Sequence, residues 1–375
     1  MKLARTLLWV WVASLLTGCS GRDVELVSGH DGMITIALQS SGLPVSRVSL
    51  SGSDPMQHVT YVQLYVFNGI DPLTARCVAS ENVMWHEQTG QLAAQYYKLQ
   101  TPLAGGEYTF VAVGLDNPLN GDGLPDLSSK GSATAYGLPG AIEAGDGLST
   151  GTLLADARAS LVDGGSVADV AESELMAGFA TSAWNGTDDI TVQLELQRRV
   201  AGVLCYVTQV PESVETIELI SATPQYADVP LCKQPEGSDF GTRQLGEESR
   251  VLLSTPVTAE ALAAEQVQLA DGTTIAKQRG SIYVAAYLLP VPQQTNMLTV
   301  RLTFTEASGK APVEKRVRLA TDNAGGYTYD FPIQANWIYS IGRKSTEVDE
   351  PADLGGDNSD IVADGNWQAD IDIPM

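Results

Sequence analysis

One short stretch of the sequence has the residue types of a catalytic serine site. Residues 147–151 read GLSTG and match the pattern G-x-S-x-G, which in some hydrolases exposes a serine on a sharp turn between a strand and a helix. That chemistry also needs an acid and then a histidine later in the chain. The last histidine is His86, which precedes Ser149. We therefore expect Ser149 to lie in a loop and the protein not to be an enzyme.

Metal-ion and cofactor sites are not expected either. Asn120, Asp122 and Asp126 lie around Gly123 as in a calcium loop, but Ser129 holds the twelfth position, where an EF-hand carries glutamate. The histidines are scattered, at His30, His58 and His86. No two cysteines are spaced as C-x-x-C, which argues against a zinc or redox site. The sequence predicts no metal and no cofactor.

The chain has four cysteines, of which Cys19 belongs to an N-terminal apolar segment. The other three are an odd number, so either one is left unpaired or all three are reduced. Cys205 and Cys232 are a possible disulfide. Spacing alone cannot establish it, because a disulfide depends on the distance between the two Cα atoms.

The charge of the chain excludes one class of partner. Its 45 acidic and 22 basic residues give a net charge of −23, spread along the sequence. A nucleic acid would be repelled by such a surface, so we expect no nucleic-acid partner. High net charge instead favours solubility outside the cell.

Strand-forming residues recur in short runs between Gly, Pro, Asn and Asp, a pattern that predicts an all-β fold. The predicted strands cover residues 33–39, 58–69, 90–99, 106–118, 189–197, 198–210, 212–222, 280–290, 296–307, 313–320 and 333–344. Short helices are predicted within 166–178 and 258–269. Residues 119–188, rich in glycine, are otherwise predicted to be loop.

The length of 375 residues favours two domains. We place an N-terminal antiparallel β-sandwich at 48–189 and a C-terminal one at 190–344, followed by an acidic linker and a last strand at 345–375.

The first residues indicate export. Lys2 and Arg5 flank an apolar run that is too short to span a membrane, so residues 1–18 are predicted to be a signal peptide. The stretch LLTGC, ending at Cys19, resembles the lipobox of bacterial lipoproteins. That resemblance implies acylation of Cys19 by chains such as palmitate and a lipid anchor in the outer membrane.

Taken in order along the chain, these features resemble the fimbrillin family, the type V pilin lipoproteins of Gram-negative anaerobes. The matching stretches are LLTGC, VQLYVFNG, GEYTFVAVGLDNP, ELMAGFATSAW with LELQRRVAGVLCYV, FPIQANWIYSIGRK and NWQADIDIPM. The resemblance implies two transthyretin-like sandwiches and a fimbrial shaft or anchor subunit that supports adhesion. Its partners would be other fimbrial subunits, and host proteins or glycans are also possible partners.

The resemblance also implies a processing site. Shaft and tip subunits of the family lose a lipidated N-terminal segment, including its first strand, to an arginine-specific protease, whereas anchor subunits keep it. Here that segment is 19–47, with the first strand at 33–39. Arg47 is the candidate site, and cleavage would leave Val48 as the first residue. An ordinary loop arginine is an equally good interpretation of Arg47.

The last ten residues, NWQADIDIPM, alternate strictly between apolar and polar, which predicts a strand with one buried face. The apolar side consists of Trp367, Ala369, Ile371, Ile373 and Met375. Residues 345–363 before it are acidic and predict a flexible tether. By resemblance to the family, this is a donor strand that enters a groove of a neighbouring subunit.

Two alternatives stay open. The last strand can instead fold back on the edge of its own second domain. The protein can also be a surface lipoprotein that binds a glycan or a host protein through its loops, for which the long segment 119–188 and Trp184, predicted to be exposed, are the motivation.

Overall fold

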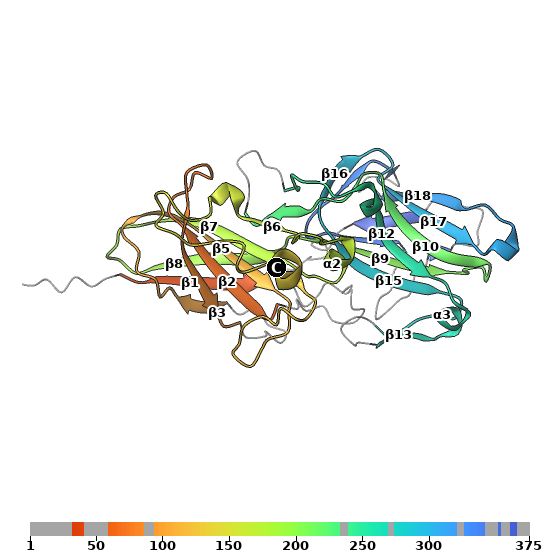
Figure 1. The fold of residues 1–375 in the computed structure, drawn as a ribbon, viewed down its shortest axis with the longest axis horizontal. Coiled ribbons are helices and arrows are strands. Elements are labelled where there is room, and N and C mark those ends of the chain that lie inside the picture. The colour runs from red at the N-terminus through yellow and green to blue at the C-terminus, as the bar shows by residue number, and fades with distance from the viewer. Residues whose placement is uncertain are drawn as a thin grey trace, which may run out of the picture.

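The computed structural model describes residues 32–40, 59–85, 94–232, 239–268, 274–320 and 326–341, and the backbone of 352–353 and 361–365. Strands dominate it and helices are short, which confirms the predicted all-β class. Figure 1 shows two strand-rich halves placed end to end, with β1 to β8 in one and β9 to β18 in the other. No helix in these parts of the chain is long and apolar enough to cross a membrane.

The first half is built on one sheet of seven strands that folds into two layers. Its order is β3 (Cys77–Val83), β2 (Tyr61–Phe67), β5 (Gly106–Leu115), β7 (Met176–Trp184), β8 (Ile190–Arg198), β1 (Ile34–Ser40) and β4 (Gln95–Lys98). Neighbours are antiparallel except β1 and β8, which are parallel. β7 and β8 pair at only two positions, so the sheet bends there and encloses an apolar core between its layers.

A second core covers the other face of β2 and β5. Val62, Leu64 and Val66 of β2 face the core between the layers, whereas Tyr61, Tyr65 and Phe67 face outward. The outward residues are buried by the segment between β5 and β7. That segment contains α1 (Ser132–Tyr136), η1 (Leu154–Asp156), β6 (Arg158–Ser160) and α2 (Val167–Ala171). The predicted loop 119–188 is therefore a packed layer, and it ends in β7.

The second half is a ten-stranded sheet. Its order is β12 (Val251–Pro256), β10 (Val214–Ser221), β17 (Leu298–Phe304), β18 (Val313–Ala320), β23 (Ile361–Gly365), β21 (Ile338–Ile341), β9 (Ala201–Thr208) and β15 (Ile282–Leu288), with β19 (Tyr327–Thr328) on β18 and β22 (Ala352–Asp353) on β9. Two small pairs accompany it, β13 (Gln266–Gln268) with β14 (Thr274–Ala276) and β16 (Val291–Gln294) with β20 (Phe331–Ile333). The remaining elements are η2 (Glu247–Arg250), α3 (Ala259–Ala263) and η3 (Glu306–Ser308).

The short helix α3 shows how local chemistry compensates for few helical hydrogen bonds. The hydroxyl of Thr258 accepts a hydrogen bond from the Ala261 N–H at the first turn. At the other end, the ammonium of Lys277 donates to the carbonyls of Ala261 and Ala264 at 2.7 and 2.8 Å. Lys277 is buried, and its burial lowers the pKa of that ammonium. The lysine thus caps α3.

The two halves are joined by a segment of the second half that packs on the first. β11 (Asp228–Pro230) pairs antiparallel with β6, and the Arg158 Nε donates to the Asp228 carboxylate at 2.5 Å. Burial opposes ionisation of Asp228, but hydrogen bonds from Arg243, Thr242 and Arg158 outweigh it and lower its pKa. Deeper in the joint, Arg198 forms a buried ion pair with Glu174. α2 lies between the halves and packs on β15 (Figure 1).

Two predicted boundaries are corrected by these pairings. Residues 190–198 form β8 of the first sheet, so the change from one sheet to the other falls at 199–200 instead of at 190. The predicted tether also contains strands, because β22 pairs with β9, and β23 pairs with β18 and β21.

Candidate functional site

The strand predicted at 33–39 exists as β1 and lies inside the first half. Ile36 and Leu38 are fully buried and Ile34 is nearly so, and all three face the core between the layers. Between these residues, Thr35 is half-buried and Ala37 is buried as well, whereas Gln39, which follows Leu38, is exposed. The apolar face predicted from the sequence is thus the face that the strand turns to the core.

β1 is held along both edges. It pairs in parallel with β8 from Ile34↔Ile190 to Ser40↔Leu196, and antiparallel with β4 from Thr35↔Lys98 to Leu38↔Gln95. At its start, the Met33 N–H donates to the Asp189 carboxylate at 2.8 Å. If β1 were removed, β8 and β4 would each lose a row of hydrogen-bond partners, and the core would open. We call the space that β1 occupies, walled by β8 and β4, the β1 groove.

Glu81 on β3 holds the β4 wall of this groove in place. Its carboxylate accepts hydrogen bonds from the Gln100 N–H at 3.0 Å, the Thr101 N–H at 2.5 Å and the Tyr97 hydroxyl at 2.9 Å. Burial opposes ionisation of Glu81, but these hydrogen bonds outweigh it and lower its pKa. Burial and the bond to Glu81 raise the pKa of Tyr97 to about 12. Within the described chain β4 pairs with β1 alone. The Glu81 contact therefore ties β4 to the other layer, together with a hydrogen bond from the Gln95 side-chain amide to the Met84 carbonyl and the packing of Tyr97 on the core.

Glu81 was missed by the sequence analysis, although one signal was present. In β3 the buried positions are Cys77, Ala79, Glu81 and Val83, every second residue. An acid in such an apolar alternation must find several donors, because burying a carboxylate without them costs several kcal/mol.

The residues predicted for lipidation, processing and donation lie outside the described chain. They are Cys19, Arg47, Val48, Trp367, Ala369, Ile371, Ile373 and Met375, and the three histidines lie outside it as well. These predictions therefore stay predictions. The structure does describe the strands closest to them in sequence. β1 ends at Ser40, before Arg47, and β23 ends at Gly365, just before the last ten residues.

No disulfide joins Cys205 to Cys232, which corrects the possible pairing. Cys205 lies on β9 and faces the core of the second half, whereas Cys232 follows β11 and packs in the outer core of the first half. The two thiols thus belong to different cores. Burial raises the pKa of Cys205 to about 12 and that of Cys232 to about 11, so both stay protonated at neutral pH.

The catalytic and calcium patterns are accounted for by local turns. Asp146 accepts hydrogen bonds from the N–H groups of Leu148, Ser149 and Thr150 and from the Ser149 hydroxyl, and these bonds lower its pKa strongly. In the other loop the Asp126 carboxylate accepts from Ser128 and Ser129. No cluster of metal-ligating side chains occurs in the part of the chain that the structure describes.

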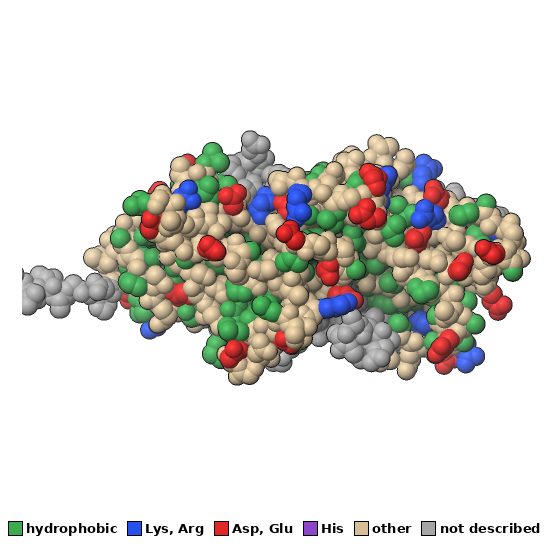
Figure 2. Space-filling view, in the orientation of Figure 1, with side chains coloured by type: hydrophobic (Ala, Val, Ile, Leu, Met, Phe, Trp, Pro, Cys, Tyr) green, Lys and Arg blue, Asp and Glu red, His purple; other side chains and the backbone are tan. Residues whose placement is uncertain are grey.

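Trp184 is buried, with 8% of its surface exposed, and its indole N–H donates to the Asp188 carbonyl at 2.7 Å. The predicted exposed aromatic is therefore wrong, and it no longer supports binding through the loops. Figure 2 shows acidic and basic side chains interspersed over the visible face of both halves, with no large basic area.

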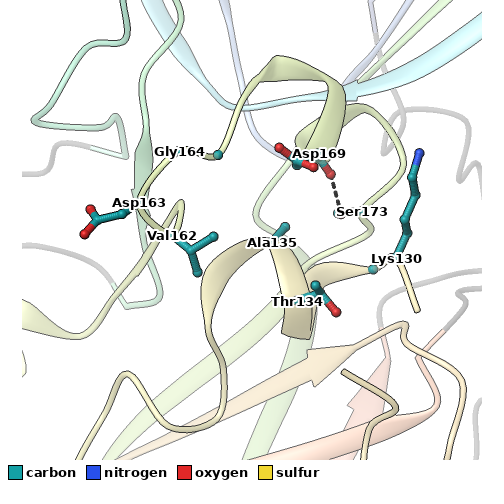
Figure 3. Close-up of a pocket in the computed structure, with 10 residues that line it drawn as sticks. Lys130, Thr134, Ala135, Val162, Asp163, Gly164, Asp169 and Ser173 are labelled. Carbon is teal, nitrogen blue, oxygen red and sulfur yellow. Dashed lines mark hydrogen bonds between the residues drawn. The ribbon is translucent and has the colours of Figure 1, made fainter. Parts of the chain in front are cut away.

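One pocket of about 220 Å³ lies between α1, the turn at 162–165 and α2 (Figure 3). Several of its polar groups have partners within the protein. The Asp169 carboxylate accepts from the N–H and hydroxyl of Ser166, and the Ser173 hydroxyl donates to the Asp169 carbonyl. The Lys130 ammonium pairs with Glu172 at 2.7 Å. These internal contacts, and not a bound molecule, account for the polar groups of Asp169, Ser173 and Lys130.

The chain matches no protein-family model and none of the curated proteins. Solved structures resemble it over most of its length. A Bacteroides thetaiotaomicron protein assigned to polysaccharide binding is 15% identical, with a TM-score of 0.41, covering 83% of this chain and 91% of the other. A Bacteroides eggerthii protein assigned to cell adhesion is 11% identical, with a TM-score of 0.43 and coverages of 91% and 89%. The tip fimbrial protein Mfa3 from Porphyromonas gingivalis, with a C-terminal truncation, is 11% identical, with a TM-score of 0.37 and coverages of 82% and 94%.

Proposed function

We propose that the protein is a structural, non-enzymatic subunit of cell-surface fimbriae, exported as a lipoprotein and joined to its neighbours by donor-strand exchange. The observation that carries the proposal is the position of β1. It is a core strand, yet it comes from the segment ahead of its domain, and Arg47 follows it closely in sequence. Cleavage after Arg47 would cut this strand from the body of the protein and leave it held by non-covalent contacts alone.

The apolar content of the two strands favours replacement of β1 by the C-terminal strand of a neighbouring subunit. Fully burying a large apolar side chain stabilises by roughly 1.5–3 kcal/mol, so Ile34, Ile36 and Leu38 contribute on the order of 5–9 kcal/mol. The four large apolar residues of the C-terminal strand, Trp367, Ile371, Ile373 and Met375, offer on the order of 6–12 kcal/mol in the same groove. The incoming strand therefore replaces the apolar contacts of β1 and adds to them.

Backbone pairing must supply the rest of the binding free energy. Association costs about 4–15 kcal/mol in lost freedom, which the apolar side chains alone barely offset. In the groove, β8 and β4 offer ladders that pair with β1 at seven and four positions. A strand that restores both ladders gains main-chain hydrogen bonds in addition to side-chain contacts.

The proposal is tested on the C-terminal strand, with the incorporation of variants into fibres measured on sheared, washed fibre fractions. Ile371→Ser combined with Ile373→Ser removes apolar contacts and is expected to abolish incorporation, as is deletion of 366–375. Asp370→Ser combined with Asp372→Ser alters only the polar side and serves as the matched control, with incorporation unchanged. Normal incorporation of the isoleucine variant would overturn the proposal, provided that circular dichroism shows a folded monomer.

The role of the subunit within the fibre depends on whether the peptide bond between Arg47 and Val48 is cleaved. N-terminal sequencing of the assembled protein distinguishes the two cases, because Val48 at the start identifies a processed shaft subunit and a lipidated Cys19 identifies an anchor. In a shaft subunit, Arg47→Ala is expected to retain the N-terminal segment and prevent exchange. Arg22→Ala, which changes an arginine ahead of β1, is the matched control and is expected to leave processing unaltered.

A further inference from the structure

The hairpin of β17 and β18 differs in charge from the rest of the chain. Residues 298–320 hold five basic and two acidic side chains, a net charge of +3 in a protein whose total is −23. The basic residues are Arg301, Lys310, Lys315, Arg316 and Arg318. At physiological salt the Debye length is about 8 Å, so acidic residues far from the hairpin are largely screened. The hairpin can therefore attract an anionic group although the protein as a whole is acidic.

Alternation along β18 turns two of these arginines to the outer face of the sheet. Lys315 and Val317 are buried, whereas Arg316 is exposed and Arg318 is half-buried. Side chains two positions apart on a strand point to the same face, so these arginines are neighbours, with Cα atoms about 7 Å apart. Arg301 on β17 faces the same side, but its guanidinium is held at 2.7 Å by a carboxylate of β10.

A tyrosine backs each of the two arginines. The guanidinium carbon of Arg316 lies 4.3 Å from the centre of the Tyr329 ring, and that of Arg318 lies 3.9 Å from the centre of the Tyr327 ring. Stacking occupies the flat face of a guanidinium, whereas its N–H donors lie at the edges and match the paired oxygens of an anionic group. Contact with a ring also limits the motion of a long side chain, so less entropy is lost when an anion binds. We call these four residues the arginine–tyrosine cluster.

The surroundings of the cluster suit a sugar. The Arg316 Nη1 donates to the Asn296 side-chain oxygen at 3.5 Å, and Thr299 lies directly opposite Arg316 on β17. The Asp330 carboxylate accepts a hydrogen bond from the Asn296 N–H at 2.9 Å. Tyr327 is 47% exposed, so its ring offers an apolar surface beside a hydroxyl. A sugar ring has matching features, with C–H groups on its faces and hydroxyls around its edge.

We propose that the arginine–tyrosine cluster binds an acidic polysaccharide, whose carboxylate or sulfate groups contact the two arginines while a sugar ring packs on Tyr327. A single small anion finds few contacts on an open sheet face, whereas a polymer with repeated acidic groups engages both arginines at once. A membrane surface fits less well, because attachment to anionic lipids takes about four or more clustered basic residues. The cluster lies in the second half, so the inference does not rest on the proposed strand exchange at the β1 groove.

Binding to immobilised chondroitin sulfate tests the proposal, with neutral dextran as the reference polysaccharide. The chain from residue 20 onward is used, which keeps β1 and omits Cys19. The wild type is expected to bind chondroitin sulfate but not dextran, and to be released at about 0.5 M salt. R316Q/R318Q loses charge-assisted hydrogen bonds and should bind at least about tenfold more weakly. The matched control R279Q/K130Q also removes two charges, from exposed ion pairs elsewhere, and should bind as the wild type does.

Two further variants distinguish a defined site from a general attraction of charge. R316K/R318K keeps both charges but loses the planar set of donors, so it should bind severalfold more weakly than the wild type. Tyr327→Ala changes no charge and should also weaken binding, because it removes the ring behind Arg318. Circular dichroism checks that each variant is folded. The inference is overturned if the glutamine or the lysine variant binds as tightly as R279Q/K130Q, or if the wild type binds vesicles of phosphatidylglycerol and phosphatidylcholine but not chondroitin sulfate.

Discussion

Replacing Glu81 by alanine is expected to detach the β4 wall of the β1 groove. The change removes the acceptor of three hydrogen bonds, from two backbone N–H groups and the Tyr97 hydroxyl. A buried donor that loses its partner costs about 1–3 kcal/mol. Because Gln100 and Thr101 are partly accessible to water, solvent replaces some of these bonds. The expected loss in the free energy of unfolding is therefore about 2–4 kcal/mol.

Urea unfolding of the chain from residue 20 onward measures that loss. Glu107→Ala, on an exposed position of β5, is the matched control and is expected to change stability by less than about 0.5 kcal/mol. Hydrogen exchange adds a local readout, since amides of 95–98 should exchange faster in Glu81→Ala than in the control. If Glu81→Ala destabilises no more than Glu107→Ala, the carboxylate does not hold β4 and our account of the groove wall is wrong.

The pH dependence gives a second test of the same contact. The folded state lowers the pKa of Glu81 from its ordinary value of 4.5, so the ionised form is the one that the fold stabilises. This contribution is present above pH 4.5 and is lost as the pH falls through the lower folded-state pKa. The stability difference between the wild type and Glu81→Gln should therefore shrink on acidification, and a difference that stays constant would contradict the assignment.

Four further outcomes are expected. Asp228→Ala leaves Arg158 buried without its carboxylate and should lower the free energy of unfolding by about 3–5 kcal/mol in urea. Burial raises the pKa of Asp116 from 3.8 to about 6, so its contribution to stability is lost as the pH rises across that interval, and Asp116→Asn should remove this loss in unfolding titrations. Leu38→Ala should cost about 2–5 kcal/mol by the same method. Thiol titration should find three cysteines unreactive in the native chain and reactive in urea, namely Cys77, Cys205 and Cys232.

Strands with strong alternation or long apolar runs were predictable from the sequence. β1, β2, β5 and β8 were all anticipated, because their buried faces recur at every second residue or along the whole strand. β7 was missed as a strand of the first sheet, since MAGFATSAW is mostly small residues with weak strand preference. Its conformation depends on packing, as Gly178 shows. A Cβ added there would lie 2.3 Å from the Glu195 carbonyl oxygen.

Contacts between distant segments were not predictable in the same way. Arg198 and Arg199 are adjacent and begin the strand predicted at 198–210. In the structure Arg198 pairs with the buried Glu174, and the Arg199 Nε donates to the Pro230 carbonyl at 2.8 Å. Both partners come from other parts of the chain, so no local sequence pattern predicts these contacts. The same holds for the two cysteines that face different cores.

The joint between the halves is held by buried contacts. The β1 groove belongs to the first half, and the chain crosses to the second half at 199–200. Around that crossing, β6 pairs with β11 and α2 packs on β15, and the charges at the joint are buried and paired. Bending there would separate Arg158 in the first half from Asp228 in the second, at a cost of several kcal/mol. We therefore expect the two halves to keep a constant orientation. If the proposed donor strand extends from the second half into the β1 groove of a neighbouring subunit, a rigid joint would repeat the same geometry from one subunit to the next, as a regular fibre requires.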